Sequence, residues 1–104
     1  MPKYMFIYHG GGPAETPEEG EKVMAAWGAW MGELGDALID GGNPAGPSMT
    51  LTAGGSSEGG GANPVSGYSL VQADSMEHAM ELGKSCPMLD AADGSIEIAE
   101  AMEM

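Results

Sequence analysis

Six segments of the chain carry a hydrophobic pattern that predicts secondary structure. Residues 3–9 (Lys-Tyr-Met-Phe-Ile-Tyr-His) are apolar or aromatic at both odd and even positions, which is typical of a buried, central strand. The glycine–proline cluster at 10–13 ends this strand. Residues 67–73 are rich in strand-forming types and residues 95–102 alternate, so each predicts a further strand.

The longest predicted element is a helix that starts at a capping signal. Thr16 can cap it, Pro17 occupies the first helical position, and Glu19 completes a capping box. An apolar stripe at helical spacing follows, made of Val23, Trp27, Trp30, Met31 and Leu34. Gly28 and Gly32 interrupt this helix at a cost of ~1 kcal/mol each, so we expect something to pack closely against the backbone there.

The second helix is predicted over a shorter stretch. Asp74 caps it, Glu77 follows three residues later, and Pro87 ends it. Its expected inner face consists of Met76, Ala79, Met80 and Gly83.

The middle of the chain predicts one strand and one loop. Residues 37–43 indicate a short strand, and residues 48–52 alternate as if they continued it beyond a kink at 43–47. Residues 54–61 hold five glycines, two serines and one glutamate. Such a composition predicts a flexible hairpin tip or loop with no fixed structure of its own.

The predicted order of elements is β-α-β-β-α-β in a single domain over residues 1–104. This order predicts an α+β fold, the ferredoxin-like sandwich, in which two helices cover one face of an antiparallel sheet. Either the face with Tyr4, Phe6 and Tyr8 or the face with Met5 and Ile7 then remains in water. We therefore expect a homodimer whose sheets pack face to face into a barrel.

Composition removes several classes of partner. Sixteen acidic residues against three basic ones give a formal charge of −13, which disfavours nucleic acid and anionic membranes. The absence of arginine disfavours phosphorylated ligands. Without a signal-peptide pattern or an apolar run of about 18 residues, we expect a cytoplasmic protein. The one cysteine, Cys86, is expected to be a buried thiol.

Several short motifs, in this order, resemble the YCII-related family, including its DGPF group. They are residues 3–8 (Lys-Tyr-Met-Phe-Ile-Tyr), 16–19 (Thr-Pro-Glu-Glu), 38–42 (Leu-Ile-Asp-Gly-Gly), 67–71 (Gly-Tyr-Ser-Leu-Val), 85–87 (Ser-Cys-Pro) and 94–98 (Gly-Ser-Ile-Glu-Ile). The resemblance implies a dimeric α+β barrel like that of muconolactone isomerase. Some members have a histidine–aspartate pair where this chain has Met24 and Glu33, and residues 54–61 replace the DGPF signature.

His9 and Asp40 are the candidates for acid–base chemistry. His9 ends the first strand beside three glycines, where a ligand can approach the backbone and an imidazole can exchange a proton near neutral pH. Its alternative role is to bond the loop backbone. Asp40 precedes two glycines and either joins His9 in one pocket or caps its own turn.

The candidate ligand walls are Trp27, Trp30 and Tyr68. Two tryptophans beside a tyrosine can enclose a flat apolar ligand, although the default role of tryptophans on an inner helical stripe is to fill the core. We expect no metal and no cofactor, because the carboxylates at 90, 93 and 97 match no calcium loop.

Two functions are compatible with these residues. One is a small enzyme of the isomerase or lyase type, which moves protons on a small apolar carbonyl or lactone compound through His9 and Asp40. The alternative is a non-catalytic dimeric module that binds a small ligand or a protein.

Overall fold

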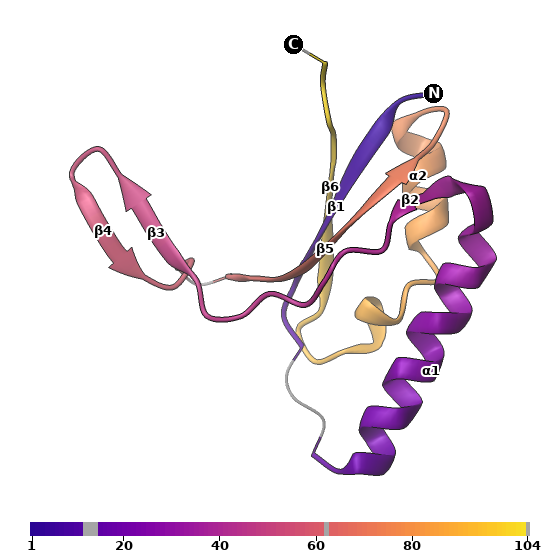
Figure 1. The fold of residues 1–104 in the computed structure, drawn as a ribbon, viewed down its shortest axis with the longest axis horizontal. Coiled ribbons are helices and arrows are strands. Elements are labelled where there is room, and N and C mark those ends of the chain that lie inside the picture. The colour runs from indigo at the N-terminus through magenta and orange to yellow at the C-terminus, as the bar shows by residue number, and fades with distance from the viewer. Residues whose placement is uncertain (12–14, 62, 104) are drawn as a thin grey trace.

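A computed structural model describes residues 1–11, 15–61 and 63–103 and has an α+β fold (Figure 1). Four antiparallel strands form the main sheet in the order β2-β5-β1-β6. The strands are β1 (Lys3–His9), β2 (Leu38–Asp40), β5 (Val65–Gln72) and β6 (Ser95–Glu100). The α+β class is confirmed, and this strand order is compatible with the ferredoxin-like plan. Part of the turn predicted at 10–13 lies outside the described residues.

The helix α1 (Pro17–Leu34) forms as its capping signal predicts. The Thr16 hydroxyl accepts a hydrogen bond from the Glu19 amide at 3.2 Å, and the Glu19 carboxylate accepts one from the Glu15 amide at 3.1 Å. Gly35 ends the helix with φ +53°, a conformation that favours glycine.

The cap predicted for α2 (Met76–Gly83) was wrong by one residue. Ser75 rather than Asp74 is the N-cap, and its hydroxyl accepts from the His78 amide at 3.1 Å. Ala79 and Gly83 are buried as predicted, whereas Met76 and Met80 are exposed. Met80 is exposed because the short helix buries only one narrow stripe.

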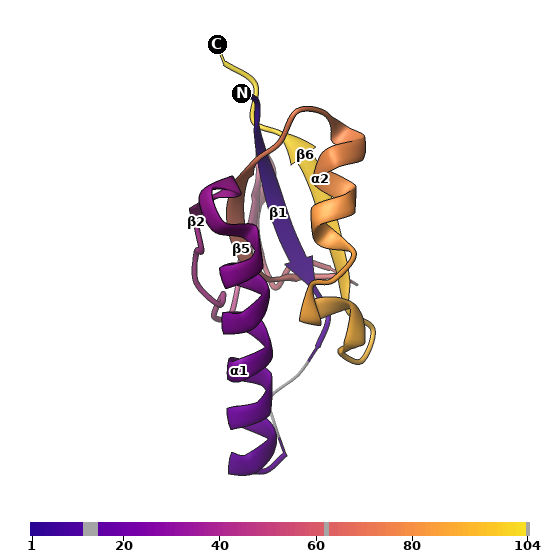
Figure 2. The same ribbon diagram turned by 90° about the vertical axis from the view of Figure 1, so that its right-hand side faces the viewer.

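Both helices lie on the same face of the main sheet (Figure 2). Tyr4, Phe6 and Tyr8 point toward them and are buried, and Phe6 stacks on Trp30 with ring centroids 6.3 Å apart. The opposite face, which we call the open face, carries Met5, Ile7, Tyr68, Leu70 and Ala99, by strand alternation and register. None of the described helices packs on the open face (Figure 1).

Two acidic groups in the core titrate abnormally. Burial raises the pKa of Tyr8 from 10.0 to about 12, against a hydrogen bond to Ser69 that lowers it. Burial likewise raises the pKa of Cys86 from 9.0 to about 11. Cys86 is 2% exposed, as expected of a buried thiol.

Stability is expected to fall at alkaline pH. The unfolded chain releases these two protons at the lower, ordinary pKa values. The free energy of unfolding therefore stays constant below about pH 9 and falls progressively between about pH 9 and pH 12. Thermal unfolding followed by circular dichroism should show a constant Tm up to pH 9 and a decline above it. Tyr8→Phe should make the decline shallower. A Tm that stays constant to pH 11 would contradict the raised pKa values of Tyr8 and Cys86.

The first half of α1 extends past the sheet (Figures 1 and 2). Val23, predicted on the apolar stripe, is therefore 50% exposed, while the rest of the stripe packs on the core. A Cβ placed at Gly28 or Gly32 would meet no atom within 4 Å in the described part of the chain. The close approach expected at these glycines is therefore not made by any described residue of the same chain.

The predictions for the middle of the chain were wrong in two respects. Strand β3 (Met49–Thr52) does not continue β2, because Gly42, at φ +70°, and the following loop turn the chain away from the main sheet. Residues 55–58, predicted to lack structure, form β4 (Gly55–Glu58), which pairs antiparallel with β3. This β3–β4 hairpin, which we call the arm, projects from the open-face side of the main sheet (Figure 1).

Candidate functional site

His9 is held at the end of β1 by two backbone carbonyls. Its Nδ1 lies 3.0 Å from the Asn63 carbonyl oxygen and 3.2 Å from that of Pro64. A carbonyl oxygen only accepts, so Nδ1 carries a proton and donates it. The ring is fixed in orientation, and its side chain is 11% exposed. The backbone-bonding role weighed for His9 is therefore present.

The second ring nitrogen of His9 faces a carboxylate that the sequence did not indicate. Nε2 lies 3.1 Å from Oε1 of Glu97, whose side chain is 70% exposed. Glu97 is opposite Ile7 in the β1–β6 register, so the pair lies on the open face. An ionised carboxylate also only accepts. The contact is a hydrogen bond when either the imidazolium or a protonated Glu97 supplies the proton.

The structure does not bring Asp40 to His9. Asp40 pairs with Leu70, which is opposite Met5, and β5 separates β2 from β1. The offset is about 13 Å along the strands and about 10 Å across them. Instead the Asp40 carboxylate accepts from the Gly42 amide at 2.8 Å, which is the turn-capping role left open above.

The three candidate wall residues lie on opposite sides of the sheet. Trp30 is 2% exposed and donates from Nε1 to the Leu82 carbonyl at 3.0 Å. Trp27 packs edge-on against Tyr8 under α1, with ring centroids 5.0 Å apart. Tyr68, 40% exposed, is opposite Ile7 on the open face. Only Tyr68 therefore shares a face with His9 and Glu97.

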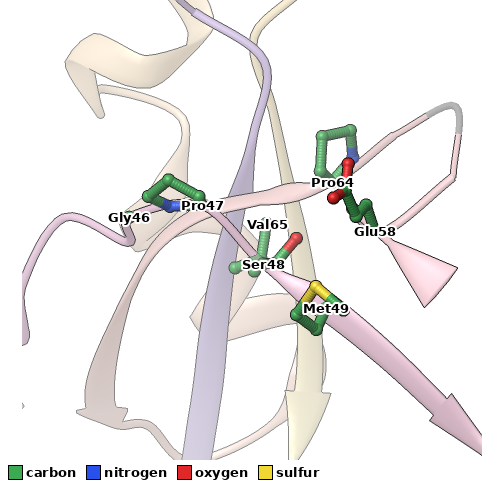
Figure 3. Close-up of a pocket in the computed structure, with 8 residues that line it drawn as sticks. Gly46, Pro47, Ser48, Met49, Glu58, Pro64 and Val65 are labelled. Carbon is green, nitrogen blue, oxygen red and sulfur yellow. The ribbon is translucent and has the colours of Figure 1, made fainter. Parts of the chain in front are cut away.

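A groove of about 640 Å³ lies at the base of the arm (Figure 3), and two of its lining residues, Pro64 and Val65, adjoin His9. The residues that line it are Gly46, Pro47, Ser48, Met49, Glu58, Gly59, Pro64 and Val65. Pro64 supplies a carbonyl to His9, and Val65 is its register partner on β5. Six of the eight lining residues are exposed. The groove is therefore a shallow recess that one chain leaves open to solvent.

The described ranges contain no group of three or more histidine, cysteine, aspartate or glutamate side chains placed to hold a metal ion. Within the same ranges, no helix has both the length and the apolar character needed to cross a membrane.

Compared with protein families, with curated proteins and with solved structures, the chain has no match.

Proposed function

We propose that this chain is a small acid–base enzyme of the isomerase or lyase type that acts on an apolar carbonyl or lactone compound. One observation carries the proposal: the fixed His9 ring and the exposed Glu97 carboxylate meet at 3.1 Å on the open face. Such a reaction removes a proton from a carbon beside a carbonyl. An isomerase returns it to another atom of the same compound, and a lyase passes it to the leaving group as the bond to that group breaks. A base that is oriented by a second group is suited to that transfer.

The residues around the pair fit a small apolar compound. Tyr68 and Ile7 form a row across the open face that ends at Glu97. A flat ligand stacked on the Tyr68 ring lies on an apolar floor with the carboxylate at one end. In this proposal His9 takes up the proton and gives it back, and Glu97 replaces Asp40 as the acid–base partner of His9. Trp27 and Trp30 only support the fold.

We propose further that the protein is a homodimer built through the open face. Met5 and Tyr68 are partly exposed there, and an apolar sheet face left in water is typically covered by a partner. This is the ferredoxin-like, dimeric α+β barrel that the YCII-related resemblance implies. A second copy would also exclude water from the His9–Glu97 pair and so strengthen its electrostatic interactions.

The test is a thermal-shift screen of small lactones and enolisable ketones against the wild type and His9→Ala. A ligand at 100 times its Kd stabilises the folded state by about 2.7 kcal/mol, which is roughly 10 °C in Tm for a chain of this size. We expect a hit that shifts the wild type and leaves His9→Ala unshifted. Glu97→Gln should retain the shift but lose turnover in a proton-exchange assay.

His78→Ala is the matched control, because His78 lies on α2, across the sheet from the open face. It should shift with the ligand as the wild type does. A His9→Ala protein that still binds the ligand would refute a site at His9.

A non-catalytic binding module is the second candidate, and a specific observation favours it. Both ring nitrogens of His9 already have partners within the chain, as in a histidine that serves structure alone. A wild type that binds the ligand but shows no proton exchange in the assay would favour this module.

A further inference from the structure

The arm has few contacts with the rest of the chain that the structure describes. All residues of β4 and three of the four in β3 are exposed, and among the described residues β3 and β4 pair only with each other. Leu51 is 83% exposed and Met49 64%. A two-stranded hairpin with nothing packed on it is marginally stable in water. The arm therefore lacks the contacts that would hold it in place.

The apolar side of the arm is continuous with the groove beside His9. Met49 lines that groove (Figure 3), and Leu51 lies on the same side of β3 because side chains alternate. The arm leaves from the open-face side of the main sheet (Figure 1). A molecule bound to the open face therefore lies between that face and the arm.

The surface of the chain is too large for a compact monomer. A folded monomer of 10.6 kDa exposes roughly 5,500 Å², whereas this chain exposes 7058 Å². Its radius of gyration is 14.7 Å, against roughly 13 Å for a compact chain of this length. The excess of roughly 1,600 Å² per chain is what each subunit of an obligate homodimer typically buries.

We infer that the arm clamps a second copy of this chain onto the open face, and that this second copy supplies the missing wall of the groove beside His9. The inference rests on the homodimer proposed above and adds how it is held and why its site needs two chains. In a two-fold dimer each chain contributes one arm, so the dimer buries two copies of Leu51.

The test compares the dissociation constant of the wild type with those of two acidic variants, by analytical ultracentrifugation over a dilution series. Leu51→Asp removes the apolar contact from both arms. Burying a leucine side chain is worth one to two powers of ten in an equilibrium constant, so we expect Kd to rise about 100-fold or more. Leu51 is 83% exposed and lies outside the core cluster of the described residues, so circular dichroism should show that the variant is folded.

Met80→Asp is the matched control. It makes the same kind of change at an exposed residue of α2, on the helical side of the sheet, and should leave Kd within a few-fold of the wild type. As a second readout, a polarity-sensitive dye attached at Leu51→Cys should shift its emission to the blue as the dimer forms. Buried Cys86, with its raised pKa, is expected to remain unlabelled.

Three results would overturn the inference, and they differ in what they leave standing. A wild type that stays monomeric at every concentration refutes the homodimer as well as the arm. A Leu51→Asp dimer as tight as the wild type refutes the arm alone. Equal weakening by Leu51→Asp and Met80→Asp would assign the effect to net charge. The His9 screen tests the acid–base function separately from all three.

Discussion

Phe6→Ala is expected to lower the free energy of unfolding by about 3–5 kcal/mol. Phe6 is 0% exposed, lies on the central strand and stacks on Trp30, so its removal leaves a cavity where sheet and helix meet. Domains of this size are stable by roughly 5–15 kcal/mol. The variant should therefore unfold at a Tm at least about 12 °C lower, as measured by calorimetry.

Met24→Ala provides the comparison for Phe6→Ala. It also removes a large apolar side chain, but Met24 is 75% exposed on the part of α1 that extends past the sheet. The expected change is within about 0.5 kcal/mol. Equal losses in the two variants would mean that the core is not centred on the helical face of the sheet.

Gly42→Ala is expected to cost about 3 kcal/mol or more, although it adds only one methyl group. Gly42 has φ +70°, and a Cβ there would lie 1.7 Å from the backbone oxygen of Tyr68. Because a backbone atom cannot move aside alone, the turn after β2 must open in addition to the strain at positive φ. Chemical denaturation at fixed pH measures the loss.

Gly28→Ala is the same substitution in open space and should raise the free energy of unfolding by about 0.5–1 kcal/mol. Gly28 lies within α1, and no described atom comes within 4 Å of the added methyl group. If Gly28→Ala were instead destabilising and the effect depended on protein concentration, a second chain would pack against that face of α1.

Elements with a local chemical signal were predicted well from the sequence. Helix α1 depends on Thr16, Pro17 and Gly35, which act within a few residues of themselves, so no knowledge of the rest of the chain is needed. Strand β1 is apolar at nearly every position, and it lies between β5 and β6 as such a pattern predicts.

The arm could not be predicted because its two strands depend on each other. The alternation of Met49 and Leu51 suits a continued β2 equally well. The glycines and serines of β4 favour a loop until β3 supplies their hydrogen-bond partners. The turn at Gly42 decides between a continued β2 and a separate hairpin. Its positive φ is one that a glycine can adopt but does not have to adopt, so the sequence alone does not predict the turn.

The candidate site was predicted in part for a similar reason. Alternation assigns His9 to a face of β1, but its partner Glu97 is set by the β1–β6 register, across most of the chain. Tyr68 was placed with the tryptophans, yet β5 turns Ser69 and Val71 inward and Tyr68 outward. The buried Ser69 is satisfied by Tyr8 and by the Gly41 carbonyl, partners that only the folded sheet provides.

The position of β1 between β5 and β6 also has a consequence for biosynthesis. Lys3 pairs with Gln72, and Tyr4 pairs with Glu100, so β1 is synthesised before the other strands of the main sheet but has both neighbours only once β6 has been made. Pairings so distant in sequence close slowly. Until then a nascent segment that is apolar on both sides stays exposed, and such segments are the ones that chaperones bind during synthesis.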